Sequence, residues 1–353
     1  MPAACTRLAL SQVGKSSSLT MQPILFTRFS ALGDVASSLR VVDAAAMAWP
    51  ERDLTFVTHE RYLSLVKLLR VNCDVRGYGR PESAFPDFWS LRRWIDQQRP
   101  LVIDLHGSTR TRVLRWMGDR RDWRVLRKKR FQRRSLCQGN DQALPADERV
   151  QQNQAGLLDL EMPLDRSWLV HPHPVPSGIL LVPGAAWAWK RWSPQRFGDL
   201  ARRLSRRGHR VQILLSSGDG LDLDGVDWGH AELLLDLPLM DCFAHLAGAQ
   251  AVVSNDTGFA HVAEGLGRPV LVLIGPTDQR MGAAPQSSNL WARAVHLGLD
   301  CQPCSQKGDR PCRVPGRPCL DSLSVAQVEE SLLRLIDDFS TFGHKICRDG
   351  GSQ

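Results

Sequence analysis

Short apolar runs alternate along the chain with longer segments whose apolar residues recur at helical spacing. The pattern predicts strands at residues 24–29, 54–58, 101–105, 179–182, 210–215, 251–254 and 269–275. It predicts helices at residues 35–48, 61–70, 195–207, 259–266 and 325–338. Strands that alternate with helices in this way favour parallel α/β layers, and no repeat of solenoid length interrupts them.

Prolines divide this alternation into two halves. They stand at positions 172, 174 and 176, and Met21 directly precedes the first strand. The expected divisions are a disordered extension at 1–20, a first α/β domain at 21–165, a linker at 166–177, a second α/β domain at 178–342 and a tail at 343–353. Two such halves would form a cleft, and ligands of α/β sheets bind beyond the carboxyl ends of the strands.

Length and composition fit two domains with full hydrophobic cores. The chain has 353 residues, of which 43% are hydrophobic. No apolar run approaches the roughly 20 residues that a bilayer-spanning helix needs. The first twenty residues include Arg7 and Lys15 but no continuous apolar core, so we expect no secretory signal and a cytoplasmic protein.

The net charge of +8 is concentrated in one segment of the chain. Residues 110–134 contain twelve Arg or Lys and two Asp, a local excess of ten, whereas the remainder has 33 basic and 35 acidic residues. Such a segment indicates an anionic partner; acidic lipid headgroups, a phosphorylated acceptor and a plain solvated face are all open. Nucleic acid is not the expected partner, because Trp116, Trp123 and Phe131 come without a recognised binding motif.

Four of the nine cysteines form a cluster, Cys301, Cys304, Cys312 and Cys319. Cytosolic thiols stay reduced, and four thiolates within twenty residues can form a tetrahedral structural zinc site. The second pair lacks the usual short spacing, so structural zinc and unligated thiols are both open.

The candidate chemistry is concentrated where predicted strands meet predicted helices. The strand at 251–254 leads into Asn-Asp-Thr-Gly, and a helix is expected directly after Gly258. A helix N-terminus has unpaired N–H groups and a partial positive charge, which suit a phosphate, and glycine lets the anion approach. The alternative is that Asp256 or Thr257 only caps the helix.

Two further charged residues lie at such junctions. Asp34, at the first strand–helix turn, suits either a capping role or a general base. Lys190 follows a Pro-Gly-Ala turn and either neutralises phosphate oxygens or packs among tryptophans. Asp222 and Asp224 resemble a metal-binding pair of some sugar transferases, but their Gly/Asp-rich surroundings favour a solvated turn.

Short motifs occur in a fixed order along the chain. They are Phe-Thr-Arg-Phe-Ser-Ala-Leu-Gly-Asp-Val at 26–35, Pro183-Gly184-Ala185 with Lys190-Arg191-Trp192, Asp256-Thr257-Gly258 with His261, and Gly275-Pro276-Thr277-Asp278. This ordered set closely resembles the heptosyltransferases of lipopolysaccharide core synthesis, glycosyltransferase family 9. The resemblance runs from about residue 21 to about residue 336. The segment at 104–107 is similar to the Asp-x-x-Gly of the family, with His106 where glutamine is more usual.

The resemblance implies a GT-B fold, in which two Rossmann-like domains face each other across a cleft. The N-terminal one would bind the acceptor and the C-terminal one the nucleotide-sugar. The resemblance also implies ADP-heptose as donor, inversion at the anomeric carbon and no catalytic metal. Asp34 would deprotonate the acceptor hydroxyl, while Lys190 and the N–H groups at 257–258 hold the diphosphate. The donor-binding residues that it implies are Lys190, Asp256, Thr257, Gly258 and His261.

On the acceptor side, the expected partner is a lipid A–inner-core saccharide at the surface of the inner membrane. The candidate acceptor-binding residues are Arg28, Ser30, His106, Arg110, Arg127, Lys128 and Arg130. The acidic residue that the family uses for the ribose hydroxyls is not at its usual place, which leaves Asp219 and Asp222 as candidates. The competing functions are transfer from another nucleotide-sugar and noncatalytic binding of a nucleotide-sugar or anionic glycan.

Overall fold

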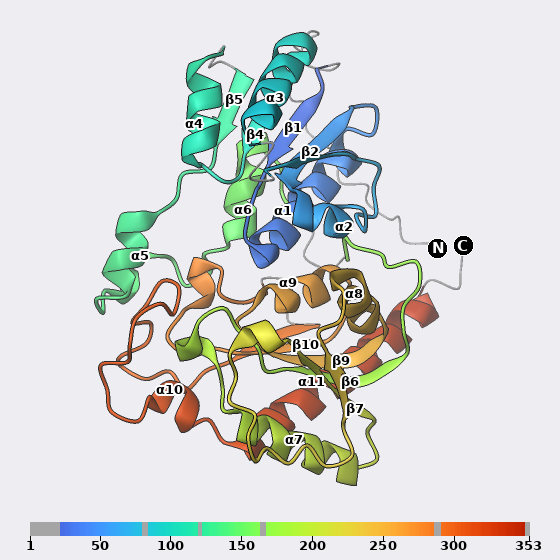
Figure 1. Cartoon of the computed structure of the whole chain (residues 1–353), viewed down its shortest axis with the longest axis vertical. Coiled ribbons are helices and arrows are strands. Elements are labelled where there is room, and N and C mark those ends of the chain that lie inside the picture. Colours follow the sequence, from blue (N-terminus) through green and yellow to red (C-terminus); the bar gives the residue numbers. More distant parts are fainter. Residues whose placement is uncertain (1–21, 80–83, 119–121, 163–166, 286–290, 350–353) are drawn as a thin grey trace, which may run out of the picture.

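The computed structural model describes residues 22–79, 84–118, 122–162, 167–285 and 291–349, and the expected extension at 1–20 lies outside them. Within these residues the chain forms two α/β domains, each built around a parallel sheet (Figure 1). The fold class that the sequence predicts is therefore confirmed. The boundaries given for the domains, linker and tail stay a prediction.

The N-terminal sheet has the strand order β3-β2-β1-β4-β5. Its strands are β1 (Ile24–Thr27), β2 (Leu54–His59), β3 (Asp74–Tyr78), β4 (Leu101–Asp104) and β5 (Trp123–Val125). Its helices are α1 (Leu32–Ala48), α2 (Leu63–Val66), α3 (Ala84–Gln98), α4 (Thr109–Trp116), α5 (Arg130–Leu136) and α6 (Val150–Ala155).

Strand β1 is the central strand of this sheet, because Ile24 pairs with Leu54 of β2 on one side and with Leu101 of β4 on the other. The strand order reverses between β1 and β4. Ligands bind at such switch points.

The C-terminal sheet has the order β11-β10-β9-β6-β7-β8. Its strands are β6 (Ser177–Val182), β7 (Val211–Leu215), β8 (Glu232–Leu235), β9 (Ala249–Asn255), β10 (Val270–Leu273) and β11 (Ala292–Val295). Its helices are α7 (Pro194–Arg206), α8 (Leu239–Gly248), α9 (Gly258–Gly265), α10 (Pro318–Asp321) and α11 (Val325–Asp349). Here the order reverses between β6 and β9, which places the turns after both strands at a second switch point.

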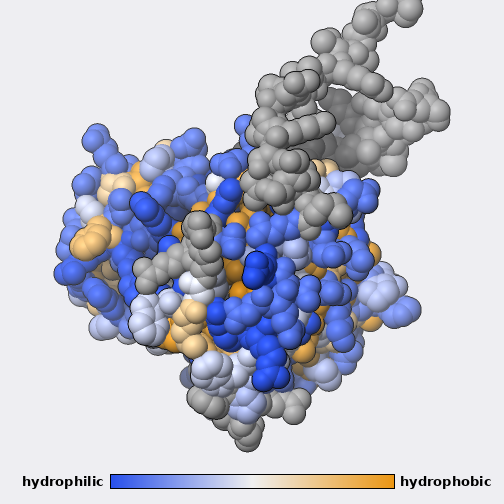
Figure 2. Space-filling model, turned by 90° about the horizontal axis from the view of Figure 1, so that it is seen from above, coloured by the Kyte–Doolittle hydropathy of each residue, from blue (hydrophilic) through white to orange (hydrophobic). Residues whose placement is uncertain are grey.

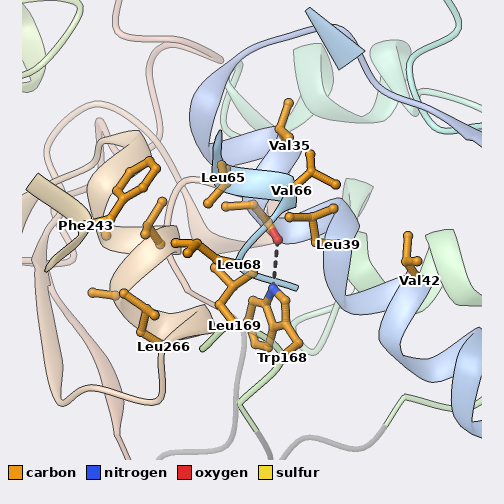
Figure 3. Close-up of a cluster of buried hydrophobic side chains, with 14 of the residues drawn as sticks. Val35, Leu39, Val42, Leu65, Val66, Leu68, Trp168, Leu169, Phe243 and Leu266 are labelled. Atoms are coloured by element: carbon orange, nitrogen blue, oxygen red, sulfur yellow. Dashed lines mark hydrogen bonds between the residues drawn. The ribbon is translucent and has the colours of Figure 1, made fainter. Parts of the chain in front are cut away.

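The two domains share one hydrophobic core across their interface (Figure 3). Helix α1 packs along α9, and the cluster includes Leu39 from α1 and Phe243 from α8. Trp168, from the expected linker, is fully buried in this cluster and donates its indole N–H to the Ala36 carbonyl oxygen at 2.9 Å. The large ring buries apolar area against both domains, so this part of the chain belongs to the core.

Two predicted helices differ from the observed ones. The prediction of one helix at 61–70 is wrong, because the chain forms a 3-10 turn at Glu60–Tyr62 and α2 ends at Val66. Beyond it, Leu69 forms a bridge with Leu169, so a tertiary contact overrides the local helical pattern. Helix α11 continues past the predicted end at 338 to Asp349.

The sequence pattern also missed β3. This edge strand reads Asp-Val-Arg-Gly-Tyr and is largely exposed except at Tyr78, so it has no apolar run to reveal it. Short elements such as β5 and α5, within the basic segment, were missed for the same reason.

No helix in the described part of the chain combines the length and the hydropathy needed to cross a bilayer. Figure 2 looks onto the end formed by the N-terminal domain, where hydrophilic side chains predominate and hydrophobic ones lie in small groups. Two large apolar side chains of the basic segment, Trp116 and Phe131, are 73% and 88% exposed. Trp116 accompanies the arginines of α4, and Phe131 those of α5.

Candidate active site

Asp34 lies in the first turn of α1. Its carboxylate accepts the Ala31 N–H at 3.2 Å and forms an ion pair with the Arg28 guanidinium. Desolvation raises the pKa of Asp34, but Arg28 and the Ala31 N–H outweigh it, so the pKa is lower than the ordinary value. The side chain is still 56% exposed, so an ionised carboxylate is accessible to an incoming hydroxyl group.

Arg28 is held by the loops that follow β1 and β4. Its Nε donates to the Ser30 carbonyl oxygen at 2.9 Å, and Nη1 donates to the Leu105 carbonyl oxygen at 2.6 Å. The side chain is buried, and its third nitrogen pairs with Asp34. Arg28 is therefore a fixed positive charge on the floor of the cleft, and Ser30 takes part through its backbone.

His106 lies beside this pair as a neutral ring. Burial, followed by the charges of Arg28 and Lys128, lowers the pKa of His106 to about 4. Its Nδ1 accepts the Phe29 N–H at 3.2 Å, so the ring supports the end of β1. Nε2 is therefore the ring nitrogen that remains for a hydrogen bond with an acceptor substrate.

A cavity of about 70 Å³ opens beside Asp34, lined by residues of both domains. Lys128 and Arg133 from the basic segment line it. They reach it because α5 extends from its own sheet toward the C-terminal domain, where Leu136 packs on Met281 (Figure 1). Burial lowers the pKa of both Lys128 and Arg133. Sequence reasoning missed Arg133, because no helix was predicted in this segment to set its direction.

The other predicted acceptor-binding residues lie elsewhere. Arg127 and Arg130 are exposed and are not lining residues of this cavity. Arg110 is also exposed, with its guanidinium 5.5 Å from the centroid of the Tyr78 ring. The structure therefore divides the predicted set into a group beside Asp34 and a group on the outer surface.

Lys190 and Asp256, two of the predicted donor-binding residues, pair with each other. Lys190 ends a 3-10 turn at Ala188–Lys190, and its Nζ lies 2.5 Å from Asp256 Oδ2. The Thr277 hydroxyl donates to the same oxygen at 2.8 Å. Asp256 follows β9 and Thr277 follows β10, so the carboxyl ends of adjacent strands form this group.

Thr257 and Gly258 begin α9 directly against the start of α1. A Cβ added to Gly258 would lie 2.7 Å from Leu32 Cβ and 2.9 Å from the Gly33 nitrogen, so only glycine fits. The N-terminus of α9, suited to an anion, therefore lies across from the first turn of α1, which carries Asp34. His261, one turn further along α9, lines the same cavity as Asp34.

The structure separates the two candidates for the ribose-binding carboxylate. Asp219 follows β7, and a Cβ added to Gly184 would lie 2.2 Å from its Oδ2, so Asp219 directly faces the turn after β6. Burial raises the pKa of Asp219. Asp222 accepts the Asp224 N–H at 3.2 Å, as expected for a solvated turn.

The predicted cysteine cluster lies beside the donor side of the cleft. A cavity of about 210 Å³ is lined by Cys301, Cys304, Cys312 and, from the N-terminal domain, Cys137. Cys319 belongs to α10 and packs in the hydrophobic core, and burial raises its pKa to about 11. Within the described ranges no group of three His, Cys, Asp or Glu residues is arranged to hold a metal ion, and structural zinc and unligated thiols both stay predictions.

The known proteins that this chain resembles are heptosyltransferases. The family model described as glycosyltransferase family 9 (heptosyltransferase) matches residues 142–314. Lipopolysaccharide heptosyltransferase 1 of Pseudomonas aeruginosa is 29% identical over 322 residues, which cover 80% of this chain and 86% of that protein. Lipopolysaccharide heptosyltransferase 2 of Salmonella typhimurium is 30% identical over 110 residues, 28% of this chain and 31% of that protein.

The fold has solved counterparts as well. The structure of E. coli heptosyltransferase WaaC with ADP has a TM-score of 0.61 at 18% identity, and the match covers 90% of this chain and 99% of that one. At this identity the likeness concerns the fold alone, and it confirms the predicted GT-B arrangement of two facing domains.

Proposed function

Because this chain belongs to glycosyltransferase family 9, we propose that it is an inverting transferase that moves heptose from ADP-heptose to a hydroxyl of the lipopolysaccharide inner core. The observation that carries the proposal is the contact between the N-termini of α1 and α9. Asp34 lies on one of them, and the Thr257–Gly258 amides lie on the other. A proton acceptor and an anion-binding site thus face one reaction space.

In the proposed reaction, Asp34 accepts the proton of the acceptor hydroxyl group while the oxygen of that hydroxyl group attacks the anomeric carbon of the heptose. The bond from that carbon to the β-phosphate oxygen breaks as the new glycosidic bond forms. The configuration is inverted, and ADP leaves with the bonding electrons. Lys190 and the N–H groups that begin α9 stabilise the charge that develops on the diphosphate. These groups supply both roles, so the proposal requires no catalytic metal ion.

The donor would join the Lys190–Asp256 pair without displacing it. A lysine ammonium has three N–H donors, so Lys190 can hold Asp256 and still donate to a phosphate oxygen. Asp256, fixed also by Thr277, would accept a hydrogen bond from a hydroxyl of the donor sugar. We assign the ribose hydroxyls to Asp219, because it faces the glycine turn after β6.

The acceptor in this proposal is a phosphorylated, acidic lipid A–inner-core saccharide. Arg28, Lys128 and Arg133 supply positive charge around Asp34, where such a saccharide would be extended. The exposed Trp116 and Phe131, on basic helices, suit the headgroup region of an anionic bilayer. The protein would therefore work at the cytoplasmic surface of the inner membrane.

Structural zinc at Cys301, Cys304, Cys312 and Cys319 is a separate proposal from the sequence, with unligated thiols as its alternative. The zinc content of the purified protein tests it. One equivalent per chain would mean that the thiols converge around the ion, and zinc-free active protein would establish them as reduced thiols.

A panel of ADP, ADP-heptose, UDP-glucose and GDP-mannose in a thermal-shift assay tests the donor. A ligand that binds only the native state stabilises it by about 2.7 kcal/mol at one hundred times its Kd. We expect stabilisation by the two ADP compounds, and ADP release from ADP-heptose only when an inner-core acceptor is present. Stabilisation by another nucleotide would indicate a different donor, binding without turnover would indicate a noncatalytic binder, and no response would reject the proposal.

A further inference from the structure

Behind the two helix N-termini, α1 and α9 carry a buried pair of opposite charges. The side chain of Arg40 is 2% exposed and that of Glu264 is 0% exposed, and Nη1 of Arg40 lies 3.7 Å from Oε1 of Glu264. One residue belongs to each domain. Apolar side chains would fill the same interface without the cost of removing two charges from water. This cost makes the pair a candidate for a role beyond packing.

Arg40 is fixed from the N-terminal side of the interface. Its Nη1 donates to Gln151 Oε1 of α6 at 2.8 Å. Its guanidinium lies 4.8 Å from the centroid of the Trp168 ring, whose own N–H is bound to the backbone of α1. The positive charge that faces Glu264 is therefore held in one position.

The other oxygen of Glu264 faces the candidate active site. Oε2 lies 3.7 Å from Nδ1 of His261, and the same nitrogen lies 3.2 Å from the Ser37 hydroxyl. The Cγ–Cδ2 edge of the ring faces Gly33, where an added Cβ would lie 2.7 Å from His261 Cδ2 and 3.5 Å from Cγ. His261 also lines the cavity beside Asp34. The contacts thus lead from the buried pair to the reaction space.

We propose that Arg40 and Glu264 are positioning residues that act on the reaction through His261. A carboxylate and a hydroxyl beside Nδ1 favour the tautomer that carries its proton there. Nε2, the other ring nitrogen, is then a hydrogen-bond acceptor for a hydroxyl of the bound sugar. Arg40 holds the Glu264 carboxylate from the other side of the interface, so the ring orientation depends on both domains being together. This inference rests on the proposed transferase function.

The test compares E264Q, R40M and the double variant R40M/E264M with the wild type. Loss of a supporting contact of this kind lowers activity by roughly 10- to 100-fold, so we expect kcat of E264Q to fall about tenfold while ADP affinity stays within about twofold. R40M should lose thermal stability because it leaves Glu264 as a buried charge without its cation. The double variant should regain stability, since neither charge remains, but not kcat.

A matched control removes a buried carboxylate away from the site. Glu329, whose side chain is 4% exposed, pairs with Arg203 and Arg207 between α11 and α7 (Figure 1). E329Q should lower thermal stability and leave kcat unchanged.

Ring ¹⁵N resonances of His261 give a readout that does not depend on turnover. In the wild type they should report a proton on Nδ1, and in E264Q they should change. Unchanged resonances and wild-type kcat in E264Q, or recovery of kcat in the double variant, would overturn the inference. A wild type without transferase activity would reject the proposed function, while the resonances would still test the action of Glu264 on His261.

Discussion

Two carboxylate–cation pairs face the cleft, one from each domain, and they differ in access. Asp34 pairs with Arg28 and keeps 56% of its side chain exposed, whereas Asp256 pairs with Lys190 and keeps 7%. Asp34 occupies the first turn of a helix, while Asp256 lies at the end of a buried strand and is covered by Thr277. An exposed carboxylate can exchange a proton with a ligand, and an enclosed one can fix a cation. The two pairs are therefore suited to different steps of one reaction.

On the acceptor side, Arg28 has two opposing effects on Asp34 as a base. Arg28 holds the pKa of Asp34 below its ordinary value, which keeps the carboxylate ionised but makes it a weaker base. We expect the anionic groups of the acceptor to attract part of the positive charge of Arg28, Lys128 and Arg133 when they bind. Asp34 would then become more basic when the hydroxyl group arrives.

The largest effect is expected for Asp34→Asn. General-base catalysis contributes about 10²- to 10⁴-fold, so we expect kcat to fall roughly a thousandfold while ADP binding is unchanged. Asp96→Asn, which removes another exposed, Arg-paired carboxylate of the N-terminal domain, is the control and should keep normal turnover. Near-normal transfer by Asp34→Asn would reject its assignment as the base.

A somewhat smaller effect on rate is expected for Lys190→Met, on the enclosed pair. Loss of a group that stabilises developing charge costs about 10²- to 10³-fold in kcat. It also leaves Asp256 without its cation, and breaking a buried pair costs about 3 kcal/mol of folding stability. The double variant Lys190→Met/Asp256→Asn should recover the thermal stability but not the transfer rate. Undiminished ADP affinity and rate in the single variant would remove Lys190 from the donor site.

The sequence predicted the parts of the candidate site that lie in strand–helix turns. An apolar run followed by Gly and polar residues is a local pattern, so Asp34, Lys190 and residues 256–258 could be found without coordinates. Their order along the chain then indicated the family and both sheets. The strand ends bring these turns together, as parallel sheets require.

The remaining site residues depend on contacts that no local pattern contains. Arg133 reaches the cavity beside Asp34 because α5 packs on Met281 of the other domain. Glu264 and Arg40 meet across the domain interface, far apart in sequence. Cysteine spacing leaves structural zinc and unligated thiols both open, and that choice stays a prediction.

Charge reversal separates the cations beside Asp34 from those on the outer surface. Lys128→Glu/Arg133→Glu places two negative charges in the cavity, so we expect KM for the acceptor to rise about tenfold and its salt dependence to weaken. Arg127→Glu/Arg130→Glu makes the same change in net charge at positions that do not line the cavity and should change KM by less than about twofold. Equal effects of the two double variants would show that only the overall charge of the segment matters.

A smaller effect, confined to the donor, is expected for Asp219→Asn. Loss of one hydrogen bond to a ribose hydroxyl costs about 1 kcal/mol, so KM for the donor should rise about fivefold with kcat little changed. Asp222→Asn, in the solvated turn, is the control and should behave as the wild type. A larger effect of Asp222→Asn would assign the ribose to that carboxylate.

The smallest effect is a shift in pH dependence on removal of Arg28. The ordinary pKa of an Asp carboxyl is about 3.9, and that of Asp34 is lowered, so the acid limb of the wild-type kcat/KM profile should lie below about pH 4. The stability that the pair contributes is likewise present above the ordinary pKa and lost as the pH falls through the lowered one. In Arg28→Met the pKa of Asp34 rises, so the acid limb should move to higher pH. Arg110→Met, which removes an exposed arginine stacked on Tyr78, should leave the limb in place. An acid limb of the kcat/KM profile that does not move in Arg28→Met would show that kcat/KM is not controlled by the ionisation of Asp34.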